Sequence, residues 1–326
     1  MTRRPGSQLP RLTLALPGLG VLAIVFAPFG LSEFQASLSV ITAIYVIMLV
    51  GLSLFLGYGG QYSFAQAVFY GIGAYTSAIL VTRHGVPVVA AFLCAGGLGG
   101  LIAYLLSTPI LRLQGYYLAV ATLAFCQIFH VLVVENFNVT GGPTGIYGIP
   151  PFSVAGLEFS SARSYHYLTW AVAVASLVFA QNLMNSRIGR ALKAIQSSEE
   201  AASVLGIDTI GLKTKIFVLT GVTGALAGSL FAHFVTYISP GTFTLELSIW
   251  LVVVLSVGGV RTIWGVVLAA AFTTVFPFLL GKYQNYNMLV FGIVLILVLK
   301  FMPNGIAGFL EEQLQRWFKK AATDQE

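Results

Sequence analysis

Apolar runs of about 17 to 25 residues recur along the chain, and this is the length that a helix needs to cross the hydrocarbon core of a bilayer. Short polar or glycine-containing connections separate the runs. The apolar runs predict membrane spans over residues 12–30, 38–56, 64–81, 86–106, 115–134, 167–184, 216–237, 247–260, 263–280 and 286–302. The third, eighth and ninth runs are short or interrupted by glycine, so a re-entrant segment and a total of nine or eleven spans stay open as alternatives.

The composition agrees with a chain embedded in lipid. Hydrophobic residues make up 57% of it and charged residues only 9%, which leaves too few polar side chains to cover a soluble globule. We therefore expect an all-α, polytopic integral membrane protein with about ten transmembrane helices. Its parts are an N-terminal segment 1–11, a membrane domain 12–302 and a tail 303–326.

The distribution of positive charge predicts the orientation of the spans. With ten spans and an inside N-terminus, all but three of the 17 Lys and Arg residues fall on inside segments, the exceptions being Arg83, Arg163 and Lys282. The positive-inside rule then places both termini in the cytoplasm. The arginines before Leu12 resemble a secretory or twin-arginine signal, but the run that follows is too long for a signal core and lacks a cleavage site. We expect an uncleaved first span.

Carboxylates are expected only in the connections between spans. Glu33, Glu135, Glu158 and Glu246 fall in outside loops, and the remaining Asp and Glu residues fall inside. Proton-coupled carriers need an ionisable residue within the bilayer, so this distribution argues against proton coupling. Sodium coupling through backbone carbonyls stays open.

Other function classes lack support in the sequence. The net charge of +6 comes from scattered cations and not from the basic patch of a nucleic-acid-binding protein. Cys94, Cys126, His130 and His233 lack the spacing of metal ligands, so we expect no metal site. The enzyme motifs HExxH and GxGD are absent, and so is the GxxxxGK[ST] phosphate loop. An enzyme is therefore not expected, and the chain does not hold ATP in that manner.

The cytoplasmic connection from Asn185 to Lys215 predicts two short helices. In the first, Ile188, Leu192 and Ile195 share one apolar face, and basic residues occupy the remainder. Ser197 and Glu200 form a capping box for the second helix, which Gly206 is placed to end.

This helix pair has two interpretations. Basic residues beside apolar ones favour a helix lying on anionic headgroups. A rigid helix pair on a face with few loops also fits the groove of a partner protein. Spacing alone does not separate the two.

A group of small and polar residues at a predicted span boundary is a candidate for the solute path. Glycine permits unwound backbone there, and the amides and hydroxyls can bind a solute or the freed carbonyls. The alternative is a loop tip with ordinary helix capping. The candidates are Gly59, Gly60, Gln61, Ser63 and Gln66.

The fifth predicted span has a mildly polar face. Thr122, Cys126 and His130 follow one another at i, i+4 spacing, with Gln127 beside them. This face either makes hydrogen bonds between helices or lines a solute path, for which Thr122 and Gln127 are the candidates.

Glycine marks two further features. The outside run TGGPTGIYGIPP, from Thr140 to Pro151, predicts a turn-dense cap. GxxxG spacings at Gly96 and Gly100, and again at Gly224 and Gly228, predict close helix packing without a substrate role.

Several motifs occur in the order found in one transporter family. They are GYGGQYSFAQAVFYGIGAYTSA (57–78), GYYLAVATLAF (115–125), TGGPTGI (140–146), GRALKAI (189–195), EEAASVLGI (199–207), GALAG (224–228), VLSVGGVRTIWGVVLAA (254–270) and PNGIAG (303–308). With them the chain resembles the permease subunits of branched-chain amino-acid ABC importers from about residue 38 to 308. The TGGPTGI segment makes it more similar to the LivM-type subunit than to the LivH-type subunit.

The resemblance implies a subunit of an ATP-driven importer that moves Leu, Ile and Val into the cytoplasm through the bacterial inner membrane. Implied partners are a homologous second permease in a heterodimer, cytoplasmic ABC ATPase subunits, a periplasmic solute-binding protein and membrane lipid. ATP is then used by the ATPase subunits, and this chain binds no cofactor. The coupling loop, residues 185–215, would dock the ATPase through Arg187, Gly189, Arg190, Leu192, Ile195, Glu199, Glu200, Ala201, Ala202, Leu205 and Gly206.

Two alternatives stay open for the function. Urea and short-chain amide permeases share most of these motifs, and a passive facilitator or channel for a small polar solute also lacks carboxylates in its spans. The chain departs from the family pattern at Gln196 to Ser198, where a charged residue is common. It departs again at Arg261 to Val266, where the family often has Gly-Thr-Xaa-Xaa-Gly-Pro.

Overall fold

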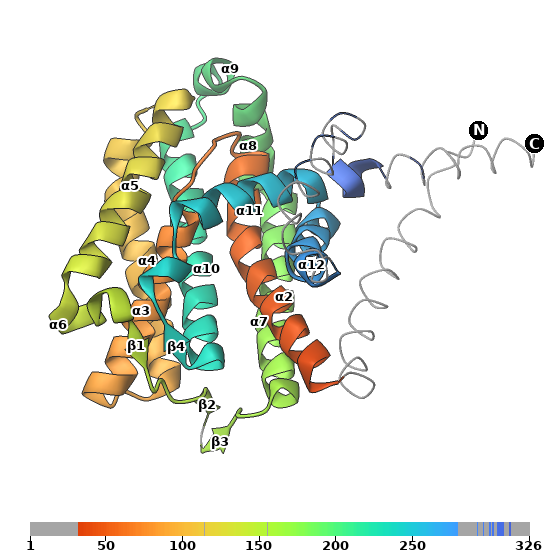
Figure 1. Ribbon diagram of the computed structural model, residues 1–326. Coiled ribbons are helices and arrows are strands. Elements are labelled where there is room, and N and C mark those ends of the chain that lie inside the picture. The colour runs from red at the N-terminus through yellow and green to blue at the C-terminus, as the bar shows by residue number, and fades with distance from the viewer. Residues whose placement is uncertain are drawn as a thin grey trace, which may run out of the picture.

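The computed structural model describes residues 32–113, 115–154 and 156–279, together with residues 292, 296, 300, 302, 305–309 and 313. In that part of the chain, long helices pack side by side and short strands lie at one end (Figure 1). Six of the helices described there are long and apolar enough to cross a membrane. The all-α membrane class is therefore confirmed. The total of ten spans and the cytoplasmic termini stay predictions, because segments 1–11, 12–30 and most of 286–326 lie outside the described residues.

The long helices follow the predicted apolar runs. They are α2 (Glu33–Ser53), α3 (Gln66–His84), α4 (Val88–Ile110), α5 (Tyr116–Glu135), α7 (Ala162–Asn185), α10 (Thr209–Val235), α11 (Leu245–Gly258) and α12 (Ile263–Leu279). The first of these continues as a π-helix, η1 (Leu54–Tyr58). The short elements are α6 (Phe137–Thr140), η2 (Gly142–Thr144), β1 (Ile146–Tyr147), β2 (Ser153–Val154), β3 (Leu157–Glu158), α8 (Arg187–Ser197), α9 (Glu199–Val204), β4 (Tyr237–Ile238) and η3 (Pro240–Thr242).

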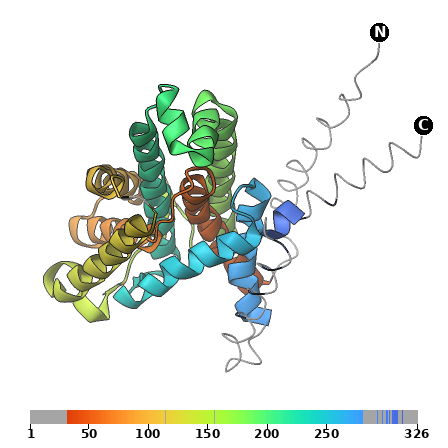
Figure 2. The same ribbon diagram turned by 90° about the horizontal axis from the view of Figure 1, so that it is seen from above.

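The α2 helix lies at the centre of the bundle. It packs against α7, α10 and α12, and seen from above it lies between these neighbours (Figure 2). Every residue from Val46 to Gly57 is buried. A helix that is apolar all round is buried in protein or in lipid, and from Val46 to Gly57 the α2 segment with η1 is buried in protein.

Glycines allow α10 to approach both α3 and α4 closely. A Cβ on Gly73 would overlap the backbone of Ala225, and a Cβ on Gly228 would overlap the Tyr70 carbonyl. On the other side, Gly96 and Gly100 face the α10 side chains Leu226 and Val222. The packing interpretation of both GxxxG spacings is confirmed.

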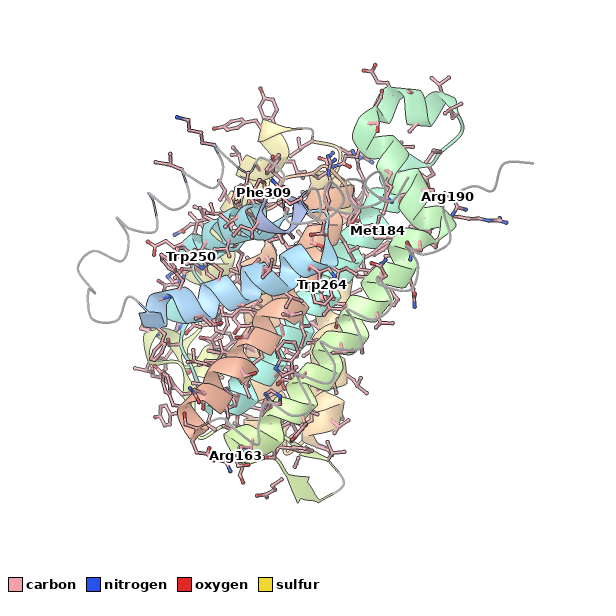
Figure 3. All side chains as sticks on the ribbon, turned by 90° about the vertical axis from the view of Figure 1, so that its right-hand side faces the viewer. Arg163, Met184, Arg190, Trp250, Trp264 and Phe309 are labelled. Carbon is pink, nitrogen blue, oxygen red and sulfur yellow. The ribbon has the colours of Figure 1, made fainter. Side chains whose placement is uncertain are left out.

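The two ends of the bundle differ in character. The short strands lie at one end and α8 and α9 at the other (Figure 1). Arg163, at the start of α7, and Arg190, in α8, lie at these opposite ends (Figure 3). The separation agrees with the predicted division of outside and inside segments, although which end faces the cytoplasm stays a prediction.

The end with the strands carries the predicted turn-dense cap. β1 pairs antiparallel with β4, and Gly141, Gly142, Gly145 and Gly148 all have positive φ. His233 of α10 holds the cap, because its ring Nδ1 lies 2.8 Å from the Pro150 carbonyl oxygen. Nε2 of the same ring bonds Ser77 in α3 at 2.8 Å.

The close approach of α4 and α10 can be tested with two glycines of the same helix. Gly99→Val should lower the free energy of unfolding by about 1–3 kcal/mol, because its side chain would overlap the Ala225 side chain and the Gly221 carbonyl. Gly97→Val, on the exposed side with no atom within 4 Å of a Cβ, should change it by less than about 0.5 kcal/mol. Thermal unfolding in detergent measures both, and equal effects would contradict the packing.

Candidate functional site

A break in the helices lies between α2 and α3. The chain leaves α2 through the π-helix η1, and residues 59–65, here called the re-entrant segment, are not helical. The side chain of Gln66 donates from Nε2 to the Met48 carbonyl oxygen at 2.8 Å. Met48 lies about 15 Å along α2 from Tyr58, at 1.5 Å per residue. Within the candidate span Glu33–Tyr58, this places the start of α3 well inside the span and not at its end.

Side chains from two other helices pair the backbone of this break. The Phe64 amide donates to Thr122 Oγ1 at 3.0 Å, and the Cys126 thiol donates to the Phe64 carbonyl at 2.9 Å. In α11, Ser248 Oγ accepts from the Ala67 amide at 3.1 Å. Non-helical backbone in a membrane requires such partners. Thr122 and Cys126 therefore make hydrogen bonds to the break, whereas a role of Thr122 in the solute path stays a prediction.

The predicted path residues of the re-entrant segment lie together and differ in exposure. Gly60, with φ +65°, is exposed, Gln61 is half-buried, and Gly59 and Ser63 are buried. Tyr62, which sequence reasoning did not select, is 58% exposed. The break therefore presents polar groups and backbone on one outer face of the described chain.

The two candidates on α5 are not brought together. Thr122 is fully buried beneath the re-entrant segment, whereas Gln127 is exposed. Five positions along a helix place two side chains about 140° apart. Gln127 therefore lies on a different side of α5 from the residues that hold the segment.

Glu246 lies in a helix and not in an outside loop, so that expectation was wrong. It belongs to the first turn of α11 and falls within the candidate span Pro240–Gly258. Thr244 caps this helix by accepting from the Leu247 amide at 3.4 Å, which lets it begin deeper than hydropathy indicates. Ser248, two residues further on, contacts the start of α3, so the exposed Glu246 lies near the break. Because a candidate span contains this carboxylate, the argument against proton coupling from carboxylate-free spans no longer holds.

In the coupling loop, α8 packs its apolar face against the bundle. Leu192 and Ile195 are buried, while Arg187 and Arg190 are exposed. Gly189 lies where α7 turns into α8, and a Cβ there would overlap the Met184 carbonyl. The predicted apolar face is confirmed, and the corner requires glycine.

The second helix of the coupling loop begins one residue later than predicted. Ser198 is its N-cap and accepts from the Ala201 amide at 3.2 Å, so the prediction of Ser197 as the cap was wrong. Ser197 instead bonds the Lys193 carbonyl within α8, because α8 continues through that residue. Gly206, with φ +80°, follows the helix as predicted.

The end of α9 is the most exposed apolar part of the coupling loop. Val204 is 86% and Leu205 is 79% exposed. Glu200 and Ala201 are also exposed, whereas Ala202 is buried against the loop itself. The loop therefore projects a small apolar tip.

An ion pair holds α9 to α10. Lys213 Nζ lies 2.6 Å from Glu199 Oε2, and the lysine side chain is only 3% exposed. Loss of Glu199 would therefore leave the buried Lys213 charge without this partner, which destabilises a fold. Sequence spacing does not reveal this pairing, since the residues belong to different helices.

A second contact joins the coupling loop to the break. Gln196, in α8, donates from Nε2 to the Gly57 carbonyl oxygen of η1 at 2.7 Å. The neighbouring Tyr58 hydroxyl donates to the Arg261 carbonyl. In the turn before α12, Thr262 Oγ1 accepts from the Gly265 amide at 3.0 Å. Thr262 thus caps α12, and both residues of this bond stand between Arg261 and Val266, the two positions that depart from the family pattern.

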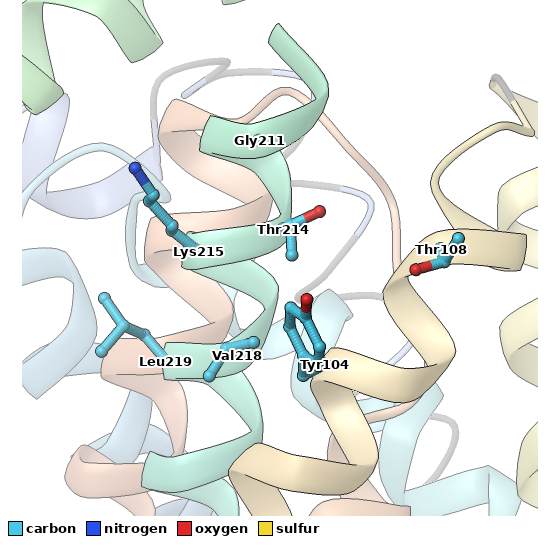
Figure 4. A pocket seen from close by; sticks show the side chains of 7 residues that line it. All are labelled: Tyr104, Thr108, Gly211, Thr214, Lys215, Val218 and Leu219. Carbon is cyan, nitrogen blue, oxygen red and sulfur yellow. The ribbon is translucent and has the colours of Figure 1, made fainter. Parts of the chain in front are cut away.

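A groove of about 630 Å³ opens between α4 and α10 (Figure 4). Its lining comprises Tyr104, Thr108, Gly211, Thr214, Lys215, Val218 and Leu219. The predicted path residues do not line it. It is therefore separate from the break between α2 and α3.

The pairing of the re-entrant segment predicts the effect of an isosteric substitution. Thr122→Val should lower the free energy of unfolding by about 1–3 kcal/mol, because the Phe64 amide loses its acceptor. Thr82→Val is the control, since that hydroxyl bonds only the Ala78 carbonyl of its own helix among the contacts described. Hydrogen exchange should accelerate at the Phe64 amide in the first variant alone. Unchanged exchange there would contradict the assigned bond.

Comparisons with known proteins agree with the motifs. A family model described as branched-chain amino acid transport system / permease component matches residues 35–299. The Escherichia coli (strain K12) high-affinity branched-chain amino acid transport system permease protein LivM is 31% identical over 325 residues, which cover 93% of this chain and 76% of the relative. The probable LivM permease of Methanocaldococcus jannaschii is 25% identical, with 87% of this chain and 88% of the relative covered.

LivH-type proteins are also related to the chain. The E. coli (strain K12) LivH permease is 26% identical over 283 residues, which cover 81% of this chain and 91% of the relative. No solved structure matches. Since the family model covers most of the chain and the E. coli LivM protein is similar over nearly all of it, this chain belongs to the branched-chain amino acid transport permease family as a LivM-type member.

Proposed function

We propose that this chain is the membrane-spanning permease subunit of an ATP-driven importer for branched-chain amino acids. The observation that carries the proposal is family membership, because the related LivM and LivH proteins are named as permeases of branched-chain amino acid transport systems. The coupling loop gives structural support, since a carrier without an ATPase has no need of a projecting helix pair.

The related proteins also support a two-permease assembly. Both LivM and LivH proteins match this chain, which favours a heterodimer with a homologous second permease. In this proposal a periplasmic protein delivers the amino acid, cytoplasmic ABC subunits hydrolyse ATP, and the complex lies in the inner membrane. This chain contributes transport and not catalysis.

The apolar tip of α9 is the proposed contact with the ATPase. Val204 and Leu205 are exposed where the loop projects furthest, and exposed apolar residues of this kind fit the groove of a partner. Within the predicted docking set, Gly189, Leu192, Ile195 and Ala202 are buried. These four would shape the loop, leaving Leu205 and the exposed polar residues to make contact.

The re-entrant segment is the proposed lining of the solute path. Gly60, Gln61 and Tyr62 lie on an outer face within the depth of the membrane, where non-helical backbone is tolerated only against protein or a water-filled cavity. The Glu246 carboxylate requires a polar surrounding for the same reason. A path between this face and the second permease satisfies both requirements.

Uptake by reconstituted complexes tests the proposed function. The chain, co-expressed with its genomic neighbours and placed in proteoliposomes, should take up labelled leucine only with ATP and the binding protein. Uptake of labelled urea under the same conditions would contradict the proposed solute. Uptake by this chain alone, indifferent to ATP, would contradict the importer and favour a facilitator.

Charge at the tip of α9 should uncouple the subunits. Val204→Asp should abolish co-purification of the ATPase while the permease still folds, because the side chain contacts little within the chain itself. Val154→Asp is the matched control, since Val154 is an exposed valine of β2 at the opposite end. Retained ATPase in the first variant would contradict docking at this tip.

A further inference from the structure

The π-helix η1 is held from two sides. On one side Gln196 of α8 donates to the Gly57 carbonyl at 2.7 Å. On the other, the backbone of Gly57 lies so close to Val260 that a Cβ would overlap the Val260 carbonyl, and Tyr58 donates to the Arg261 carbonyl. The coupling loop and the turn between α11 and α12 therefore meet at the same helix end.

The contact from Gln196 is made to a carbonyl that the helix leaves free. The last carbonyls of a helix have no N–H group further along to pair with, and the chain after Tyr58 is no longer helical until Gln66. The side-chain amide of Gln196 takes the place of that missing N–H. Gln196 thus caps a helix to which it does not belong.

The capped turn has the hydrogen-bond pattern of a π-helix. The Gly59 amide bonds the Leu54 carbonyl at 3.1 Å, which is the i to i+5 pattern of a π-helix. Such turns are rare and usually occur at functional sites. Converting one to α-helix moves the following chain by one position, about 1.5 Å and 100°.

The chain that would move is the re-entrant segment. Its far end is fixed by Thr122, Cys126 and Ser248, so a change at η1 must be absorbed between Gly59 and Phe64. We infer that Gln196 is a positioning residue, through which the coupling loop sets the conformation of the re-entrant segment. This rests on the proposed function, in which the coupling loop receives the ATPase.

The ion pair of the coupling loop does not involve the break. Lys213 and Glu199 join α9 to α10, a continuous helix that is separate in sequence from the break. Among the described residues of α8 and α9, Gln196 alone has a side-chain hydrogen bond to η1 or to the re-entrant segment. Movement of α8 therefore reaches the segment most directly through this amide.

The test compares side chains of similar length, with and without a hydrogen-bond donor, at position 196 of the complete, reconstituted complex. Gln196→Met keeps the length of the side chain and removes the donor, whereas Gln196→Lys restores one. Ser197→Ala is the control, since that hydroxyl bonds only within α8 among the contacts described. Labelled leucine uptake and ATP hydrolysis are measured together, and co-purification of the ATPase is measured in each variant.

Gln196→Met should retain the ATPase and its hydrolysis but lower the leucine taken up per ATP by roughly 3- to 10-fold, the effect of one hydrogen bond. Gln196→Lys should recover most of that ratio, and Ser197→Ala should leave it unchanged. An unchanged ratio in Gln196→Met would overturn the inference, as would loss of ATPase binding, which would make Gln196 a docking residue. Absence of ATP-dependent uptake in the unsubstituted complex would instead overturn the proposed function.

Discussion

Backbone groups that leave a helix inside a bilayer must be paired by protein, because lipid offers them no partner. The break between α2 and α3 creates this requirement. A hydroxyl and a thiol from α5 and a hydroxyl from α11 pair the Phe64 and Ala67 groups of the break. The positions of α5 and α11 around the centre of the bundle follow from these contacts.

The same break lies between the two parts of the molecule to which we assign function, the coupling loop and the proposed solute path. One end of the break is the π-turn capped by Gln196 of the coupling loop, and the other end is the start of α3, where Gln66 contacts Met48. In the proposed function, a continuous helix in this place would be a rigid element between the coupling loop and the solute path. An interrupted helix would let a small change at the loop alter which groups face the solute.

Periodicity and motifs predicted the features that depend on neighbouring residues. The apolar runs anticipate each long helix described, and Gly206 ends α9 as its conformational freedom suggested. The cap of α9 was misplaced by one residue, because Ser197 and Ser198 are equivalent in sequence and only the end of α8 distinguishes them.

Features that depend on distant residues were not predictable from spacing. The spacing predicted the polar face of α5. The hydrogen bonds of Thr122 and Cys126 to the Phe64 backbone, however, depend on how the distant break folds back against α5. Glu246 was placed in a loop because hydropathy does not show that α11 begins before it, at Leu245 with Thr244 as its cap. The pairing of Lys213 with Glu199 depends in the same way on how two helices meet.

Water accessibility of the re-entrant segment in the assembled importer tests the central claim most directly. A cysteine introduced as Tyr62→Cys would be exposed to a charged thiol reagent that does not cross membranes, with native Cys94, which is exposed on α4, as the lipid-facing control. The account predicts that the new cysteine reacts, at a rate that ATP changes, while Cys94 does not. A cysteine at position 62 that stays unreactive with and without ATP would contradict it.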